Sequence, residues 1–164
     1  MKLLRIILYI GLFGLTTLAQ AQTIIPLERG KGGVRAKNID DYKDEMKMAE
    51  RQRNDSLQYV DHLRRAFNAL HTDSIGQAEL LFNKALKLRP TAPGNHVIKF
   101  NLGLIDMARG QNVEAVKKLT DIIKEYPNYF DARLARAEAN LQLNKANEAV
   151  EDAEQVLDKT DFEG

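Results

Sequence analysis

The chain has 164 residues, of which 44% are apolar and 29% are charged, a composition ordinary for a globular domain. Its formal net charge of +1 gives no reason to expect nucleic acid as a partner. The absence of cysteine excludes disulfides and thiolate metal sites.

The first 21 residues have the organisation of a secretory signal peptide. Lys2 and Arg5 provide a positive start, an apolar run spans residues 6–18, and Ala19-Gln20-Ala21 forms a small-x-small cleavage site. The apolar run is short for a transmembrane helix, which needs about 20 residues. We therefore expect residues 1–21 to be a cleaved signal peptide and the protein to be exported to a bacterial periplasm or cell envelope. The alternative is an inner-membrane anchor formed by the uncleaved segment. In both cases the protein meets the membrane only through this segment.

Residues 22–39 have the composition of a flexible linker, with Pro26, three glycines and few apolar residues. The sequence Gly30-Lys31-Gly32-Gly33 lacks both the spacing and the Lys-Ser/Thr ending of a phosphate-binding loop. We therefore interpret this segment as a tether.

A helix is predicted from Asp40 or Asp41 to about Leu70, with apolar residues at alternating steps of four and three. Its first part, residues 40–58, is an N-terminal extension helix with no counterpart elsewhere in the chain. This part either caps the rest of the protein or forms a coiled-coil dimer seam. Two polar residues interrupt the seam, which favours the capping interpretation.

The segment from Ser74 to Pro90 has the pattern of a capped amphipathic helix, and this pattern returns twice. Ser74 can cap the first turn with Gln77 as its capping-box partner, and Pro90 ends the helix. The first small residue of the pattern recurs at spacings of 37 (115 − 78) and 34 (149 − 115) residues, as Ala78, Ala115 and Ala149. Twelve positions before each alanine, a preceding helix also carries a small residue: Ala66, Gly103 and Ala137. Periods of this size indicate stacked helical pairs.

These positions resemble the motif of the tetratricopeptide repeat, which has a Leu-Gly-like pair in its first helix and an Ala-aromatic-Ala-Pro pattern in its second. The matching residues are Ala66, Ala78, Phe82, Ala85 and Pro90; then Leu102, Gly103, Ala115, Leu119, Ile122 and Pro127; then Ala137, Ala149, Ala153 and Val156. The resemblance implies repeats at residues 59–92, 93–129 and 130–160. It also implies an all-α fold, a right-handed α-solenoid of about three helix-turn-helix repeats with an extra N-terminal helix.

The sequence departs from the motif in two places. The large aromatic residue near the start of each first helix is replaced by His62, Lys99 and Arg133. In the third unit, Asp161 stands at the position of the closing proline. Asn95 is predicted to cap the first helix of the second unit. Asn128 or Asp131 is predicted to start the first helix of the third unit.

The pattern of chemically reactive residues does not indicate catalysis. The three histidines lack the spacing of three or four residues that places two metal ligands on one helical face: His62, His71 and His96. Ser56 and Ser74 lack the glycine frame of a nucleophile. We therefore expect a protein that is not an enzyme and that needs no cofactor or metal.

The remaining candidate site is a surface for a protein or peptide partner. In stacked helical pairs the first helices line the concave side. By resemblance to tetratricopeptide proteins, the groove residues expected to bind the partner are Leu63, Arg64, Phe67, Val97, Phe100, Asn101, Leu104, Asp131, Leu134 and Glu138. Capture of a C-terminal carboxylate, which some family members perform, is not implied, because apolar residues hold the clamp positions: Leu63, Phe67, Phe100 and Leu104. An apolar groove instead predicts an amphipathic helix or an apolar segment as ligand.

The function that follows is a non-catalytic adaptor or scaffold in the bacterial cell envelope. The alternative is a self-associating or membrane-proximal spacer whose groove is filled by its own N-terminal helix through Tyr42, Met46 and Ala49; otherwise the groove residues are core between repeats. The apolar side of the last helix, from Ala149 to Leu157, favours a homo-oligomer formed through this end. The scaffold does not identify the partner.

Overall fold

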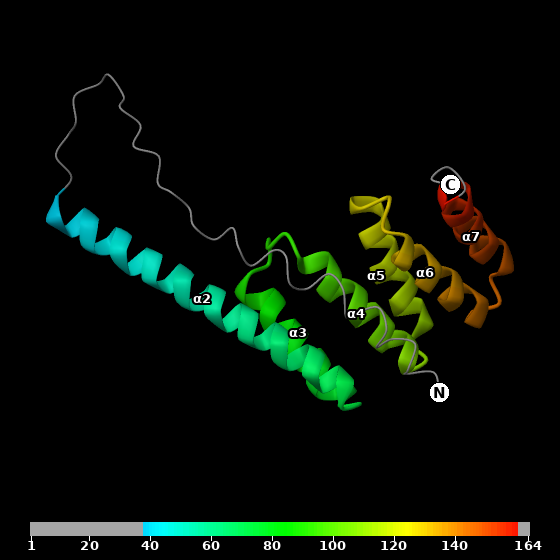
Figure 1. Ribbon diagram of the computed structural model, residues 1–164, viewed down its shortest axis with the longest axis horizontal. Coiled ribbons are helices and arrows are strands. Elements are labelled where there is room, and N and C mark those ends of the chain that lie inside the picture. Colours follow the sequence, from blue (N-terminus) through cyan, green and yellow to red (C-terminus); the bar gives the residue numbers. More distant parts are fainter. Residues whose placement is uncertain (1–37, 161–164) are drawn as a thin grey trace, which may run out of the picture. The chain divides into compact units, whose positions relative to one another are not determined.

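The computed structural model describes residues 38–160, which form six α-helices and no strand. In chain order these are α2 (Ile39–His71), α3 (Ile75–Leu88), α4 (Asn95–Ala108), α5 (Asn112–Glu125), α6 (Phe130–Gln142) and α7 (Ala146–Thr160) (Figure 1). The predicted all-α helical repeat is confirmed. The predicted signal peptide, residues 22–37 of the predicted linker, and Asp161 lie outside the described residues.

The chain divides into two compact units between Leu57 and Gln58, within α2. In the first unit the described residues form the beginning of α2, and none of their side chains is buried. Neighbouring turns are joined by exposed ion pairs, Lys43 with Asp40 at 3.4 Å and Lys47 with Asp44 at 3.9 Å. Such pairs stabilise a helix only slightly.

The second unit, from Gln58 onward, is built from helices that pack on their sequence neighbours (Figure 1). The small residues predicted at the helix crossings have this role. A Cβ atom at Gly103 would lie 3.3 Å from Cγ and 3.4 Å from Cδ2 of Leu119, so α4 and α5 meet where only hydrogen fits comfortably. Ala66 and Ala78 are fully buried at the corresponding positions of the first pair.

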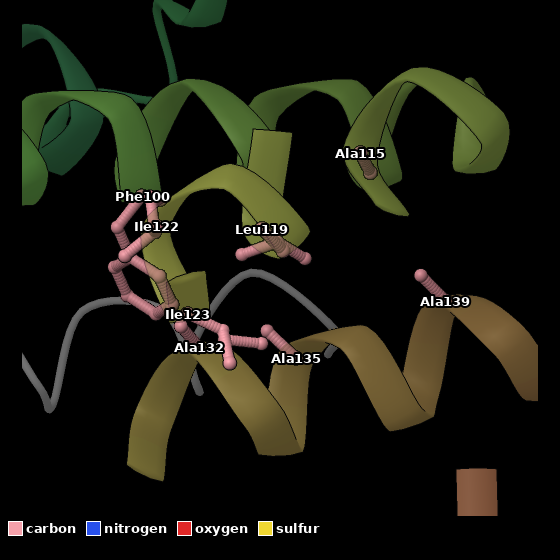
Figure 2. Close-up of a cluster of buried hydrophobic side chains, with 8 residues drawn as sticks. All are labelled: Phe100, Ala115, Leu119, Ile122, Ile123, Ala132, Ala135 and Ala139. Atoms are coloured by element: carbon pink, nitrogen blue, oxygen red, sulfur yellow. The ribbon is translucent and has the colours of Figure 1, made fainter. Parts of the chain in front are cut away.

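The main hydrophobic core lies among α4, α5 and α6. Figure 2 shows Phe100 directed from α4 into the space where Ile122, Ile123 and Ala132 also lie. Leu119 is fully buried in the same cluster. Burying a large aliphatic or aromatic side chain contributes about 1.5–3 kcal/mol, so this cluster holds the three helices together.

The first helical pair is joined to α4 by one aromatic contact and one polar chain. The rings of Phe67 and Phe82 meet edge to face at 5.2 Å. The hydroxyl of Tyr59 donates to Oδ1 of Asn95 at 3.0 Å, and Nδ2 of Asn95 donates to the Arg89 carbonyl at 2.7 Å. Asn95 therefore bridges α2, the α3–α4 turn and α4.

The prediction that Asn95 caps α4 was wrong. Gly94 occupies the N-cap position, and Asn95 is the first helical residue, with a buried side chain. The predicted start of α6 was also wrong, since Tyr129 precedes the helix. Ser74 does stand at the N-cap of α3, but its side chain makes no cap hydrogen bond and instead lies 3.5 Å from the Thr72 carbonyl.

The turn predictions hold better. Gly110 follows α4 with a φ of 77°, and Asn144 follows α6 with a φ of 59°. Both values lie in the left-handed region, which glycine and asparagine tolerate best. These residues end the two first helices and let the chain reverse into α5 and α7.

Candidate functional site

Helices α2, α4 and α6 each carry a stripe of side chains that core packing leaves exposed or half-buried. Steps of three and four residues place each stripe on one side of its helix. The stripe residues are Val60, Leu63, Arg64 and Phe67 on α2; Val97, Leu104 and Met107 on α4; and Asp131, Leu134, Glu138 and Leu141 on α6. We call this set the first-helix face.

The first-helix face is mostly apolar. Val60 is 43% exposed, Val97 is 37% exposed and Leu134 is 44% exposed, so each of the three helices offers an accessible aliphatic side chain. Leu104 and Met107 are partly buried and pack on the core cluster beneath. Single exposed aliphatic residues are ordinary, but a recurrent set at equivalent positions of successive repeats marks a surface suited to a partner.

Two of the predicted groove residues belong to the interior. Phe100 is only 9% exposed, because Ile122, Ile123 and the Tyr129 ring, 5.2 Å away, surround it. Asn101 is also buried, and its Nδ2 donates to the Val97 carbonyl at 2.8 Å. Both residues therefore support α4 from within and present little side-chain surface to a ligand.

The predicted residues on α2 remain at the surface. Leu63 and Phe67 are half-buried, while Arg64 is exposed and its Nη2 donates to Asp61 at 2.7 Å. Hydrogen bonds from Arg64 and the charges of Arg64 and Arg65 lower the pKa of Asp61, against a small opposing effect of burial. This cation is engaged within its own helix, and its contact with a ligand stays a prediction.

On α6 the first-helix face changes character. Asp131, Leu134, Glu138 and Leu141 follow one another at steps of three, four and three residues, so acidic and apolar side chains alternate. Burial raises the pKa of the Asp131 carboxyl above its usual value. Burial, with a smaller contribution from the Asp131 charge, raises the pKa of the neighbouring Tyr129 to about 12.

The opposite side of α6 carries its two cations. Nε and Nη2 of Arg136 donate to the two carboxylate oxygens of Asp152 at 2.7 and 2.6 Å, a bidentate pair. Nη1 of Arg133 lies 3.5 Å from the same carboxylate, and Asp152 is only 2% exposed. Hydrogen bonding to Asp152 raises the pKa of Arg136. This cluster fixes α7 on α6.

An aromatic cluster at the start of α4 was missed from the sequence. The His96 ring lies 4.4 Å from the Tyr126 ring and 5.6 Å from the Tyr129 ring, and Phe100 adjoins Tyr129. Its members are 26 or more residues apart, except His96 and Phe100, which share one face of α4 at a step of four. That local step was the only signal available without the fold.

The chemistry of the described residues offers no metal centre. Within residues 38–160, no three His, Asp or Glu side chains gather in a way that would hold a metal ion. Likewise, none of the helices in this range is long and apolar enough to cross a membrane. The arrangement can bind a partner through contact and charge.

Comparisons with known proteins identify the architecture. A tetratricopeptide repeat protein from Parabacteroides merdae superposes on 63% of this chain with a TM-score of 0.60 and 20% sequence identity. The second TPR of Spaghetti (RPAP3), a structure with a bound HSP90 peptide SRMEEVD, superposes on 70% of it with a TM-score of 0.57 and 24% identity. The fold is thus that of tetratricopeptide repeat proteins.

The matched lengths differ between these two structures. The aligned part spans 40% of the Parabacteroides merdae protein and 96% of the Spaghetti (RPAP3) domain. No protein-family model and no curated protein matches the sequence.

Proposed function

We propose that this protein is a non-catalytic adaptor that binds a segment of a partner protein on its first-helix face. The observation that carries the proposal is the set of accessible aliphatic side chains at Val60, Val97 and Leu134, one on each first helix. Removing such side chains from water on binding contributes about 25 cal/mol per Å² of apolar surface. A partner segment that covers all three helices would gain from each of them.

The form of the ligand follows from the shape of the stripe. Three parallel apolar stripes are matched by an amphipathic helix or an apolar extended segment, whose side chains recur at regular steps. The peptide bound to the similar Spaghetti (RPAP3) domain supports a peptide as the ligand class. The acidic character of that peptide is not carried over, because apolar residues hold the clamp positions here.

We further propose that the protein acts in a bacterial cell envelope after export. The support is the signal-peptide pattern of residues 1–21, with its cleavage site at Ala19-Gln20-Ala21. The alternative is retention at the inner membrane by the same segment. Mass spectrometry of the protein isolated from its native cells separates the two, since cleavage leaves Gln22 as the first residue.

A second candidate function is a self-associating spacer whose face is covered by its own N-terminal helix. Exposed apolar side chains on α2 and α7 favour it: Ile39 and Met46 are 70% and 73% exposed, and Val150 is 53% exposed. Val156 is buried, so the apolar side of α7 is divided between the interior and the surface. Sedimentation at high concentration tests this function, and a monomer would contradict it.

The adaptor proposal is tested by selecting displayed 20-residue peptides on the purified protein. Enriched peptides are then titrated by fluorescence anisotropy against the wild type, a Val97→Ser/Leu134→Ser variant and a Val113→Ser control. Val113 is 64% exposed on α5, away from the first-helix face. The proposal predicts a loss of about tenfold or more in affinity for the first variant alone. Failure to enrich any peptide, or equal losses in both variants, would contradict it.

A further inference from the structure

Helix α6 separates its charges by side. Its two arginines, Arg133 and Arg136, both point to the buried carboxylate of Asp152 on α7. Its two acids, Asp131 and Glu138, belong to the first-helix face, on the other side of the helix. The positive charge of α6 is therefore used inside the protein, and its negative charge is presented at the surface.

The acids replace apolar residues of the preceding repeat. Asp131 lies 34 positions after Val97 (131 − 97), and Glu138 lies 34 positions after Leu104 (138 − 104). Leu134 lies the same distance after Phe100 and stays apolar. The first-helix face is thus apolar over α4 and becomes acidic at two points over α6. The two carboxylates are two helical turns apart, about 10 Å along the axis.

Neither carboxylate has a cation of its own. Among the described residues, no ion pair or hydrogen bond reaches the carboxylate of Asp131 or Glu138. The nearby cations are engaged elsewhere: Lys99 lies 3.8 Å from Glu125, Lys118 pairs with Asp106, and Arg133 faces Asp152. Burial of Asp131 without a compensating charge raises its pKa, which is the response expected of a carboxylate awaiting a positive partner.

We propose that α6 selects a basic amphipathic helix, whose apolar side covers Val97, Leu104 and Leu134 and whose Lys or Arg side chains meet Asp131 and Glu138. The inference rests on the proposed adaptor function and specifies the ligand. The acids fix the orientation as well as the charge of the ligand, since α2 and α4 offer no equivalent carboxylate on this face. Basic residues of the ligand must lie at the edge that reaches α6.

The test uses three fluorescein-labelled helical peptides of 18 residues that share one leucine-rich face. They carry lysine, glutamine or glutamate at two flanking positions seven residues apart, one pair per peptide. Affinities are measured by anisotropy at low and at high salt. The proteins are the wild type, an Asp131→Asn/Glu138→Gln variant and the Val97→Ser/Leu134→Ser variant.

The chain offers a matched control for the charge change. Glu114 and Asp121 are exposed on α5, also seven residues apart, and no ion pair among the described residues involves them. A Glu114→Gln/Asp121→Asn variant therefore removes the same net charge with the same spacing from a different surface. It controls for long-range attraction of a cationic peptide to the protein as a whole.

The proposal predicts that the wild type binds the lysine peptide about fivefold to tenfold more tightly than the glutamate peptide, with a preference that falls at high salt. The Asp131→Asn/Glu138→Gln variant should lose this preference, and the α5 control should keep it. A preference that survives in the first variant, or is absent from the wild type, would overturn the inference.

The outcomes also separate this inference from the adaptor proposal. If Val97→Ser/Leu134→Ser weakens all three peptides equally while the wild type shows no charge preference, the face binds helices but does not select basic ones. If the Val97→Ser/Leu134→Ser variant binds every peptide as tightly as the wild type does, the first-helix face is not the binding surface and both proposals fall.

Discussion

At Asp131, two physical effects act in opposite directions. Its place in the first turn of α6 favours a negative charge through the helix dipole. Its burial disfavours that charge, and the raised pKa of the carboxyl indicates that burial dominates. The ionised form therefore lowers the stability of the folded protein at neutral pH while it presents a charge to a ligand.

The substitution Asp131→Asn should raise the free energy of unfolding at pH 7. Since the folded-state pKa lies above the unfolded value of 3.8, the protonated carboxyl is favoured by folding. That contribution is complete below 3.8 and is lost as the pH rises through the folded-state pKa. The gain from asparagine should thus shrink as the pH falls below about 3.8. Urea denaturation at pH 7 and pH 3 measures it, and a less stable variant at pH 7 would show that the dipole dominates.

Asp152 is the most consequential buried charge among the described residues. Replacing it with alanine would leave Arg133 and Arg136, with side chains only 16% and 21% exposed, without their anion. The expected loss in free energy of unfolding is about 3 kcal/mol, the usual result of removing one member of a buried ion pair. Denaturant titration measures it.

Asp158 provides the comparison, because it is exposed on the same helix. Asp158→Ala should change the free energy of unfolding by no more than about 0.5 kcal/mol. Equal effects of the two substitutions would mean that the Arg136–Asp152 pair does not hold α7.

At the scale of the helices, close packing of α4 on α5 depends on Gly103. Gly103→Val should lower the free energy of unfolding by about 2 kcal/mol or more, since its side chain would meet the fully buried Leu119. Gly76→Ala is the control, because nothing lies within 4 Å of the added Cβ, and it should leave stability unchanged or slightly higher. Thermal unfolding compares them, and a Gly103→Val variant as stable as the wild type would contradict the packing argument.

The helices themselves could largely be predicted from the sequence, because their signals are local. The small residues twelve positions before Ala78, Ala115 and Ala149 fixed the helical pairs, and the breaks at Pro90, Gly110 and Asn144 fixed their ends. Caps were less predictable: Asn95, Asn128 and Asp131 all have a capping side chain, but tertiary contacts decide which residue precedes each helix. Asn95 was drawn into a buried bridge instead.

The candidate site could be predicted only in part. Helical spacing placed Val97, Leu104 and Leu134 on the correct stripe. It did not show that Phe100 is covered by Tyr129, which is 29 residues away (129 − 100). Nor did it show that Arg133 and Arg136 are held by Asp152, the fact that leaves α6 with acids alone at its surface. Both facts depend on which helices are neighbours.

At the scale of the whole molecule, the two units differ in what stabilises them. From Asn38 to Leu57, no side chain is buried and the helix depends on local hydrogen bonds and exposed ion pairs. Helices of this length are marginal in water without packing. From Tyr59 onward, buried side chains recur in every helix.

Native-state hydrogen exchange should therefore separate the units. Amides of residues 43–57 are expected to exchange at least about tenfold faster than those at the centres of α4 and α5. Equal protection in both regions would show that the first part of α2 is packed against another surface, as the spacer hypothesis requires.

The central claim is that the first-helix face binds a helical segment, and methyl NMR with a selected peptide tests it most directly. The account predicts that the methyl resonances that shift on binding are those of Val60, Leu63, Val97, Leu104, Leu134 and Leu141. The methyls of Leu80, Val113 and Val150, exposed on α3, α5 and α7, should stay unchanged. Shifts confined to these second helices, with none on α2, α4 or α6, would contradict the account.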